Sequence, residues 1–362
     1  MSKIISIGTA VPPYKHEQDD ILTFMQQLYA LDETEKRKLR FLYRQSGIDR
    51  RYSFISDYSR PLHDWKFYPH SENLEPFPSL EQRMTWFNRF APQLSLEAIR
   101  RCLDHKVKGT EITHLISVSC TGMSAPGLDL QVMELLDLPK NIFRTSVNFM
   151  GCYASIHALK LADQICRLEP NARVLIFCTE LCTLHLQKET TPDNFASGLL
   201  FGDGSAAILV AGKSHPAKGI SLTGFYSEVV TKGKKDMSWE LSSTGFQMTL
   251  SGYVPDLIEE DISILVDNAL SQHGMNKEDV DAWCIHPGGK KILEAIQKSL
   301  SITKEDLKSS YDVLRDYGNM SSATILFVLK DIQLALQGTR KNIFGVAFGP
   351  GLTMETFIAS TE

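Results

Sequence analysis

Three residues have side chains suited to thioester chemistry: Cys152 in MGCYAS, His286 in CIHPGG and Asn319 in YGNMSS. A helix amino terminus and a nearby imidazole should make the Cys152 thiolate accessible well below the usual thiol pKa of about 8.5. An imidazole and a carboxamide that both donate hydrogen bonds can hold a thioester oxygen while negative charge builds on it. If the fold brings these residues together, they predict acyl transfer through Cys152.

An internal repeat supplies a reason for them to meet. GCYASIHALKLADQI, from Gly151, and GNMSSATILFVLKDI, from Gly318, share a glycine, small residues and an apolar helical face, at an offset of 318 − 151 = 167 residues. The same offset places residues 98–122 on residues 265–289, and both stretches read as helix, polar connector and apolar strand ending in glycine. Two halves packed about an approximate twofold axis would bring the turns that carry Cys152, His286 and Asn319 to the centre.

The elements that must position these turns follow from the same pattern. Alternating strands and helices predict an α/β fold with mixed or parallel sheets covered by helices. We expect an amino-terminal half at residues 1–212, carrying the cysteine, and a carboxy-terminal half at residues 213–362, carrying the histidine and the asparagine. Residues 51–93 do not fit the repeat and are rich in proline and aromatic residues, so they predict inserted loops and short helices over the body.

Composition narrows the kind of ligand and the compartment. The formal net charge of −5 gives no reason to expect nucleic acid or an anionic membrane as the main partner. Seven cysteines without CxxC pairs or histidines at zinc spacing argue against a disulfide framework and a structural metal. There is no basic leader and no run of about 18 apolar residues. We expect a cytoplasmic protein that acts on a small ligand and does not insert into membranes.

Each of the three residues also has an ordinary structural explanation. A buried cysteine is usually a small hydrophobic residue, a histidine after a strand can be a satisfied core residue, and asparagine is a common helix N-cap. The shared offset favours the catalytic interpretation.

At these residues the sequence resembles the type III polyketide synthases, the chalcone synthase-like branch of the thiolase superfamily. The motifs MGCYAS, LFGDGSAA, IHPGGKKIL, YGNMSSATILFVL and GVAFGPGLTME occur in the family's order over nearly the whole chain. The resemblance implies a thiolase-like αβαβα layered fold with two pseudo-duplicated halves, a homodimer, and no metal or redox cofactor. It also implies iterative Claisen condensation of malonyl-CoA onto an acyl-CoA starter.

The resemblance assigns roles by motif position. Cys152 would take the starter as a thioester, and His286 with Asn319 would promote malonyl decarboxylation by stabilising the enolate. Phe201, in LLFGDG, would gate the junction between the CoA tunnel and the cavity. The motif ELCTLH is more similar to bacterial members of the family than to the plant enzymes. Because these bacterial members include enzymes that make alkylpyrones and alkylresorcinols, the resemblance implies a pyrone- or resorcinol-type product.

The cavity is expected to differ from that of the plant enzymes. Met248, in GFQMTL, stands where they usually carry a second gating phenylalanine, and Ala125 stands where a methionine commonly reaches into the partner subunit. Cys182 and His185 replace threonines. A flexible methionine favours a starter longer than acetyl unless Met123 or Phe246 refills the space. The substrate-contact candidates are Phe201, Met248, Cys120, Thr121, Ala125, Cys182, His185, Gly349 and Gly351.

The CoA phosphates require cations. Arg50 and Arg51, in GIDRRY, lie where the family places basic residues at the tunnel mouth, and Arg suits phosphate through its bidentate fork. Lys290 and Lys291, after HPGG, are further candidates.

Three alternatives remain open. A ketosynthase III-like enzyme would use the same residue types but condense once and use a carrier protein. A hydroxymethylglutaryl-CoA synthase-like enzyme would need a glutamate general acid, for which no motif stands out. A catalytically inactive partner subunit would not need all three residue types.

Overall fold

The structure is a computed structural model that describes residues 2–71, 74–104, 107–336, 338 and 340–361. Its strands are β1 (Ser2–Ala10), β2 (Tyr14–Glu17), β3 (Arg50–Ser53), β4 (His114–Ser119), β5 (Phe143–Asn148), β6 (Arg173–Leu181), β7 (Asp203–Ala211), β8 (Ile220–Val229), β9 (Met237–Ser242), β10 (Gly245–Leu250), β11 (Ala282–Ile285), β12 (Asn342–Gly349) and β13 (Thr353–Thr361). Its α-helices are α1 (Gln18–Leu28), α2 (Glu33–Gln45), α3 (Leu80–Leu103), α4 (Leu128–Leu135), α5 (Ala154–Leu168), α6 (Pro192–Leu200), α7 (Val254–Ser271), α8 (Lys290–Leu300), α9 (Lys308–Tyr317) and α10 (Thr324–Ala335).

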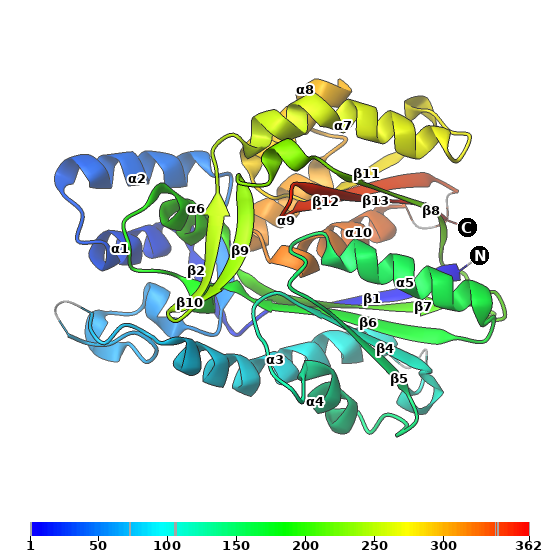
Figure 1. Cartoon of the computed structure of the whole chain (residues 1–362), viewed down its shortest axis with the longest axis horizontal. Coiled ribbons are helices and arrows are strands. Elements are labelled where there is room, and N and C mark those ends of the chain that lie inside the picture. Colours follow the sequence, from blue (N-terminus) through cyan, green and yellow to red (C-terminus); the bar gives the residue numbers. More distant parts are fainter. Residues whose placement is uncertain (1, 72–73, 105–106, 337, 339, 362) are drawn as a thin grey trace.

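Nine strands form one mixed sheet in the order β11-β12-β13-β8-β1-β7-β6-β4-β5. Strand β4 runs parallel to β5 and β6, and β11 runs parallel to β12, whereas the other pairs are antiparallel. The sheet is folded so that β8 and β11 to β13 lie above the remaining strands in Figure 1. Helices α5 and α10 lie between these two parts, α7 and α8 cover one outer face, and α3 and α4 cover the other. This is the expected αβαβα order of layers.

Each of the two central helices buries an apolar face between the two parts of the sheet. Ile156 and Leu159 of α5 and Ile325 and Leu329 of α10 have no exposed surface. The two helices fall at equivalent places in the predicted repeat, as do β4 and β11. His105 and Lys106, in the predicted connector before β4, lie outside the described residues.

The prediction of loops and short helices for residues 51–93 is wrong from residue 80 onward. The segment begins with β3 and two 3₁₀ turns, but α3 then runs for 24 residues from an N-cap at Ser79. Phe87, Ala91, Leu94 and Ala98 are buried at helical spacing, on a helix that packs on β1, β6 and β7. Pro92 lies inside α3 and obscured this periodicity in the sequence.

Within the described residues, no helix combines the length and the apolar character needed to cross a bilayer.

Candidate active site

Cys152 lies in the turn between β5 and α5, two residues before the helix begins. Gly151 makes this turn possible, because its φ is +89° and a Cβ there would come within 2.3 Å of Cδ of Pro350. The part-buried Cys152 thiol donates to the Ser321 hydroxyl oxygen at 3.7 Å. Ser321 belongs to the turn before α10, so the two related turns face each other.

Asn319 lies in that second turn, and its side chain is anchored at one end. Its Oδ1 accepts a hydrogen bond from the backbone N–H of Ser321 at 2.8 Å and one from the Thr324 hydroxyl at 3.4 Å. Its Nδ2 donates to the carbonyl of Gly288 at 3.5 Å, a long bond that a better acceptor can displace. The amide therefore presents its donor end to the site.

His286 follows β11 and is only 1% exposed. Within the described residues, neither of its ring nitrogens has a hydrogen-bond partner. Burial lowers the pKa of His286 to about 3, so the imidazole is neutral at physiological pH. A buried imidazole with both nitrogens unengaged can exchange hydrogen bonds with a substrate.

The three residues meet through two short links. Ser321 contacts Cys152 through its hydroxyl and Asn319 through its backbone N–H. Gly288 accepts from Asn319 and donates its own N–H to the carbonyl of His286 at 2.9 Å. The turns thus converge as the repeat predicts.

The expected low pKa of Cys152 is wrong for this structure. Burial raises the pKa of its thiol to about 12, and the bonds with Ser321 and Asn319 only partly oppose that effect. Burial disfavours the charged thiolate, and the neutral His286 supplies no positive charge to offset it. The thiol is protonated until a reaction removes its proton.

Glu180, at the end of β6, is a buried carboxyl group that the sequence reasoning missed although it begins the motif ELCTLH. It accepts hydrogen bonds from the backbone N–H of Cys120 at 2.9 Å, the Thr121 hydroxyl at 2.8 Å, and the Ser322 hydroxyl. Burial raises its pKa to about 7. Glu180 therefore ties the turn after β4 to the turn that carries Asn319.

Two adjoining cavities lie beside Cys152. The smaller one is lined by Cys152, Cys120, Thr121, Met237 and Pro350, among others. The larger one reaches His185, Phe246 and, at its far end, Met25. The lining residues that the two cavities share are Cys182, Phe201, Trp239 and Met248. The two cavities therefore meet at these four side chains.

The hairpin of β9 and β10 forms one wall, and His185 holds it in place. Its ring stacks on Phe246 with the centroids 4.3 Å apart, accepts the backbone N–H of Phe246 at Nδ1, and pairs through Nε2 with the Thr121 carbonyl at 2.8 Å. Trp239 donates its indole N–H to the Cys120 carbonyl at 2.6 Å. Trp239 is a lining residue for which the sequence offered no motif.

Three predicted contact residues lie elsewhere in the single chain. Ala125 is exposed and lines a separate depression beside β5, so it does not reach the cavity of its own chain. Gly349 and Gly351 flank Pro350 rather than lining either cavity themselves. A Cβ on Gly349 would come within 2.6 Å of the Tyr153 ring.

Arg51 was predicted to bind CoA, and its position contradicts that prediction. Its side chain is 4% exposed and donates to Gln18 and to the carbonyl of Phe201, inside the protein. The sequence shows the charge of a residue but not its burial.

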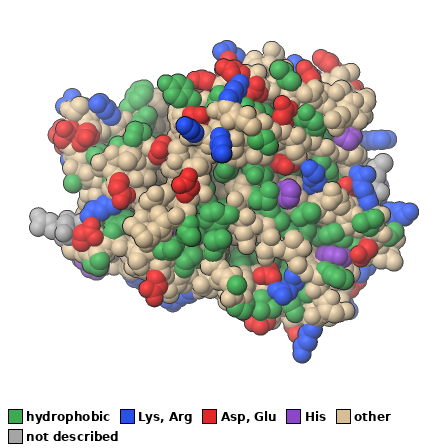
Figure 2. All heavy atoms as spheres, in the orientation of Figure 1, with side chains coloured by type: hydrophobic (Ala, Val, Ile, Leu, Met, Phe, Trp, Pro, Cys, Tyr) green, Lys and Arg blue, Asp and Glu red, His purple; other side chains and the backbone are tan. Residues whose placement is uncertain are grey.

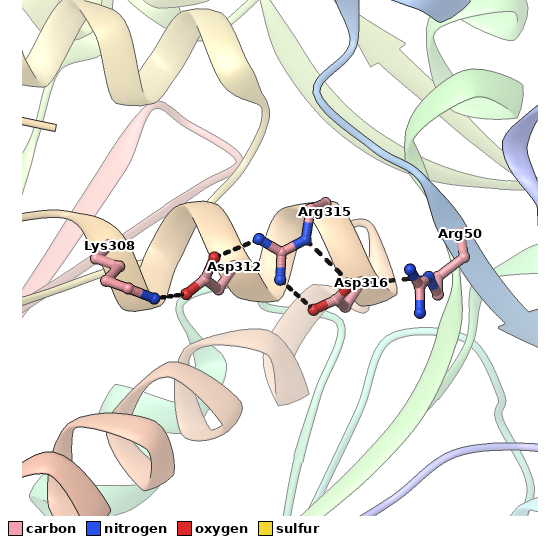
Figure 3. A network of polar contacts seen from close by, with 5 residues as sticks. All are labelled: Arg50, Lys308, Asp312, Arg315 and Asp316. Atoms are coloured by element: carbon pink, nitrogen blue, oxygen red, sulfur yellow. Dashed lines mark hydrogen bonds and ion pairs between the residues drawn. The ribbon is translucent and has the colours of Figure 1, made fainter. Parts of the chain in front are cut away.

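Arg50 points to the surface and ends a chain of ion pairs along α9. Its Nε lies 3.7 Å from Oδ1 of Asp316, which also pairs with Arg315, and Arg315 in turn pairs with Asp312 (Figure 3). Asp316 already offsets the charge of Arg50.

Lys290 and Lys291 begin α8, immediately after the turn that carries His286. Lys290 lines a surface groove together with the basic residues Lys304, Lys308 and Arg315. Lys291 is exposed. The groove also contains the carboxylates of Asp49, Glu305 and Asp312, and Asp312 pairs with both Lys308 and Arg315. Lys290 and Lys304 are therefore its main candidates for binding a phosphate-bearing ligand next to the turn that carries His286.

Comparison with known proteins adds independent findings. Residues 1–214 match the family model "Chalcone and stilbene synthases, N-terminal domain", and residues 222–361 match the corresponding C-terminal domain. A "Probable polyketide synthase 1" of Dictyostelium discoideum is 30% identical over 98% of this chain, which spans only 11% of that protein. An "Alpha-pyrone synthesis polyketide synthase-like Pks18" of Mycobacterium tuberculosis is 31% identical over 97% of this chain and 89% of its own length. The crystal structure of PKS-I from the brown alga Ectocarpus siliculosus superimposes with a TM-score of 0.93 at 28% identity, covering 100% of this chain and 98% of that one.

Proposed function

The chain belongs to the chalcone and stilbene synthase family of type III polyketide synthases, and on that premise we propose how its residues divide the reaction. Cys152 carries the acyl starter, and His286 and Asn319 decarboxylate malonyl-CoA and direct its enolate to the thioester. The observation that carries this proposal is the convergence of the three turns through Ser321 and Gly288. The substrates are CoA thioesters, and the reaction we propose needs no further cofactor.

Starter loading begins from a neutral thiol, because burial raises the pKa of Cys152. The Cys152 sulfur attacks the thioester carbonyl carbon while a ring nitrogen of the neutral His286 accepts the thiol proton. The tetrahedral intermediate then breaks its bond to the CoA sulfur, and that sulfur leaves with the proton from His286. The net result is one acyl thioester exchanged for another.

Extension uses His286 and Asn319 as hydrogen-bond donors to the substrate. The thioester carbonyl oxygen of malonyl-CoA accepts hydrogen bonds from the ring N–H of His286 and from Nδ2 of Asn319. Loss of CO2 leaves an enolate whose negative charge these donors stabilise. Its carbon attacks the acyl carbonyl on Cys152, and the bond to the Cys152 sulfur breaks. The thiolate that leaves takes up one proton from water and becomes the neutral thiol again. The backbone N–H of Ser321 holds the side-chain oxygen of Asn319, and this bond orients Nδ2 toward the substrate.

The starter we propose is a medium or long acyl chain, and the product is a pyrone or a resorcinol. Two features support this: the larger cavity extends beyond Met248 toward Met25, and the mycobacterial relative is described by its alpha-pyrone synthesis. The number of extensions is then limited by the room that the starter leaves in the cavity.

The assembly we propose is a homodimer formed at β5. This strand is the edge of the nine-stranded sheet, and most of its residues are exposed. Phe143, Met123 and Leu135 are 67%, 50% and 44% exposed in the single chain. On the face drawn in Figure 2, hydrophobic side chains form a group below the centre, and others are scattered among charged side chains. An open edge with exposed apolar side chains favours pairing with a second chain.

We propose that the CoA nucleotide binds in the groove lined by Lys290 and Lys304, and Lys291 and Arg50 remain candidates for further phosphate contacts. The compartment we propose is the cytoplasm, where the cysteines, none of which forms a disulfide among the described residues, would stay reduced.

The experiment that tests this function combines two mass measurements. Incubation with an acyl-CoA starter alone should add one acyl group, and peptide mapping should place it on Cys152. Malonyl-CoA should then yield products extended by more than one unit. Extension by a single unit, or a requirement for carrier-bound malonate, would favour the ketosynthase III-like alternative. The absence of acylation with every starter tried would contradict the proposed activity.

A further inference from the structure

Residues 199–202 connect the two halves of the protein at the catalytic centre. The carbonyl of Leu200 accepts the backbone N–H of Asn319 at 2.9 Å, and the N–H of Gly202 donates to the carbonyl of Asn319 at 3.0 Å. Phe201, between them, forms a parallel bridge with Asn319. The backbone of Asn319 is therefore placed by this segment, which also carries the Phe201 ring into both cavities.

Two side chains hold the same segment from its other side. Nη1 of Arg51 donates to the carbonyl of Phe201 at 2.6 Å, and Nε2 of Gln18 donates to the carbonyl of Leu199 at 3.0 Å. Nε of Arg51 donates to Oε1 of Gln18 at 3.1 Å, which joins the two side chains into one unit. Residues 199–202 therefore accept hydrogen bonds from Arg51 and Gln18 at two carbonyls and pair with the backbone of Asn319 on the other side.

The surroundings of Arg51 leave it little freedom to move. Its side chain is 4% exposed and that of Gln18 is 6% exposed. Gly318, immediately before Asn319, has a φ of +66°, and a Cβ there would come within 2.8 Å of Cδ of Arg51. The aliphatic part of Arg51 therefore packs directly against the turn that carries Asn319.

The guanidinium of Arg51 donates to Gln18 and to the Phe201 carbonyl, and it also interacts with the Tyr43 hydroxyl; none of these groups is a carboxylate. Burying a cation without a carboxylate in direct contact is costly, and a hydrophobic side chain could fill the same space more cheaply. The planar fork of arginine, however, fixes the directions of two donors at once, which the single ammonium of lysine does not do. We therefore attribute the presence of arginine to the fixed directions of its hydrogen bonds to Gln18 and to the Phe201 carbonyl.

We propose that Arg51, together with Gln18, is a positioning residue that sets the Asn319 amide against the substrate oxygen. This inference rests on the proposed function, because it assigns Arg51 an effect on the step in which Asn319 acts. Arg51 touches no reacting atom. Its influence passes through the carbonyl of Phe201 to the backbone of Asn319.

The test is Arg51→Lys, assayed for malonyl-CoA decarboxylation and for acylation of Cys152. A small displacement of a catalytic group is costly, so we expect kcat for decarboxylation to fall by about tenfold or more. Arg51 also lines the larger cavity, so acylation is measured with acetyl-CoA, whose acyl group is too short to reach beyond Met248. The KM for malonyl-CoA and the rate of Cys152 acylation by acetyl-CoA should stay within about twofold. Arg83→Lys is the matched control. Arg83 has no exposed surface and donates to the carbonyls of Pro78, Leu184 and Leu186, away from residues 199–202. An equal loss of decarboxylation in both variants would overturn the proposal.

A double-mutant cycle separates positioning from general damage. If Arg51 acts through Asn319, adding Arg51→Lys to Asn319→Ala should lower decarboxylation by less than about twofold further. Full additivity would overturn the inference while leaving the role of Asn319 intact. Unchanged decarboxylation in Asn319→Ala alone would instead contradict the proposed function. If Arg51→Lys does not fold, Gln18→Ala takes its place, with the same split between decarboxylation and acylation expected.

Discussion

Asn319 accepts a hydrogen bond from the backbone N–H of Ser321 at 2.8 Å, and the atom that accepts it is the side-chain oxygen. Asn319 is not the N-cap of the following helix, but its side-chain oxygen holds the turn through this bond. This structural role and the proposed catalytic role are compatible, because they use opposite ends of one amide. A residue that could accept the same bond but could not donate would separate the two roles.

Asn319→Asp is such a change. Aspartate keeps an acceptor for the Ser321 N–H but replaces the donor with a carboxylate oxygen, which repels an enolate. Loss of one oxyanion donor costs roughly 10²- to 10³-fold in rate, so malonyl-CoA decarboxylation should fall by at least that factor. The buried carboxylate should lower the temperature of thermal unfolding, so persistent acylation of Cys152 is the measurement that shows an intact site. Decarboxylation at the wild-type rate would exclude Asn319 as a donor.

The second prediction concerns Cys152→Ala. Without the thiol no starter can be held, so chain extension should be abolished, whereas decarboxylation of malonyl-CoA needs only His286 and Asn319 and should continue. Release of CO2 or acetyl-CoA measures the second activity, and product mass measures the first. If the variant still extended chains, another residue would have to be the nucleophile.

The repeat in the sequence was enough to predict the meeting of Cys152 and Asn319, because equivalent turns of duplicated halves face each other across a pseudo-twofold axis. It could not predict the pKa of Cys152, which burial raises, nor the interior position of Arg51, because burial depends on packing between distant segments. Trp239 was missed for the same reason. It joins the cavity through a hairpin that bears no motif of its own.

The third prediction follows from His286. Burial lowers its pKa to about 3, so its protonation does not change near neutrality. As pH falls, the imidazole would gain a proton only close to that value. The decarboxylation rate of Cys152→Ala should therefore show no inflection from His286 between about pH 6 and pH 8. Glu180, whose pKa burial raises to about 7, titrates in this range, so the profile is measured both in Cys152→Ala and in Cys152→Ala with Glu180→Gln. An inflection near the ordinary histidine pKa of about 6.5 that persists in the Glu180→Gln variant would show that His286 titrates normally and is better solvated during turnover than in this structure.

The fourth prediction is that Phe143→Glu prevents self-association. Phe143 begins the edge strand β5 and is 67% exposed, so a negative charge there should disrupt an apolar interface at the sheet edge while leaving the single chain folded. Light scattering after gel filtration gives the mass in solution. Ile264→Glu is the control, because Ile264 is 58% exposed on the outer helix α7. A dimer that survives Phe143→Glu, or a wild-type monomer, would rule out the β5 interface.

The last prediction is that Met248→Phe shortens the preferred starter. Met248 lines both cavities and, with Trp239 paired opposite it on β9, stands at their junction. Methionine is unbranched and can move aside for an acyl chain, whereas a phenylalanine ring is rigid and would narrow the passage. Each methylene buried beyond the junction contributes about 0.8 kcal/mol, or roughly a fourfold preference, so blocking two or three of them should change selectivity by more than tenfold.

The measurement is kcat/KM for a series of acyl-CoA starters of increasing length. A medium or long optimum in the wild type that moves to shorter chains in Met248→Phe is the expected result. Phe246 already stacks on His185 in the same wall, so an optimum that is short in the wild type and unchanged in the variant would mean that this aromatic packing, and not Met248, limits the cavity.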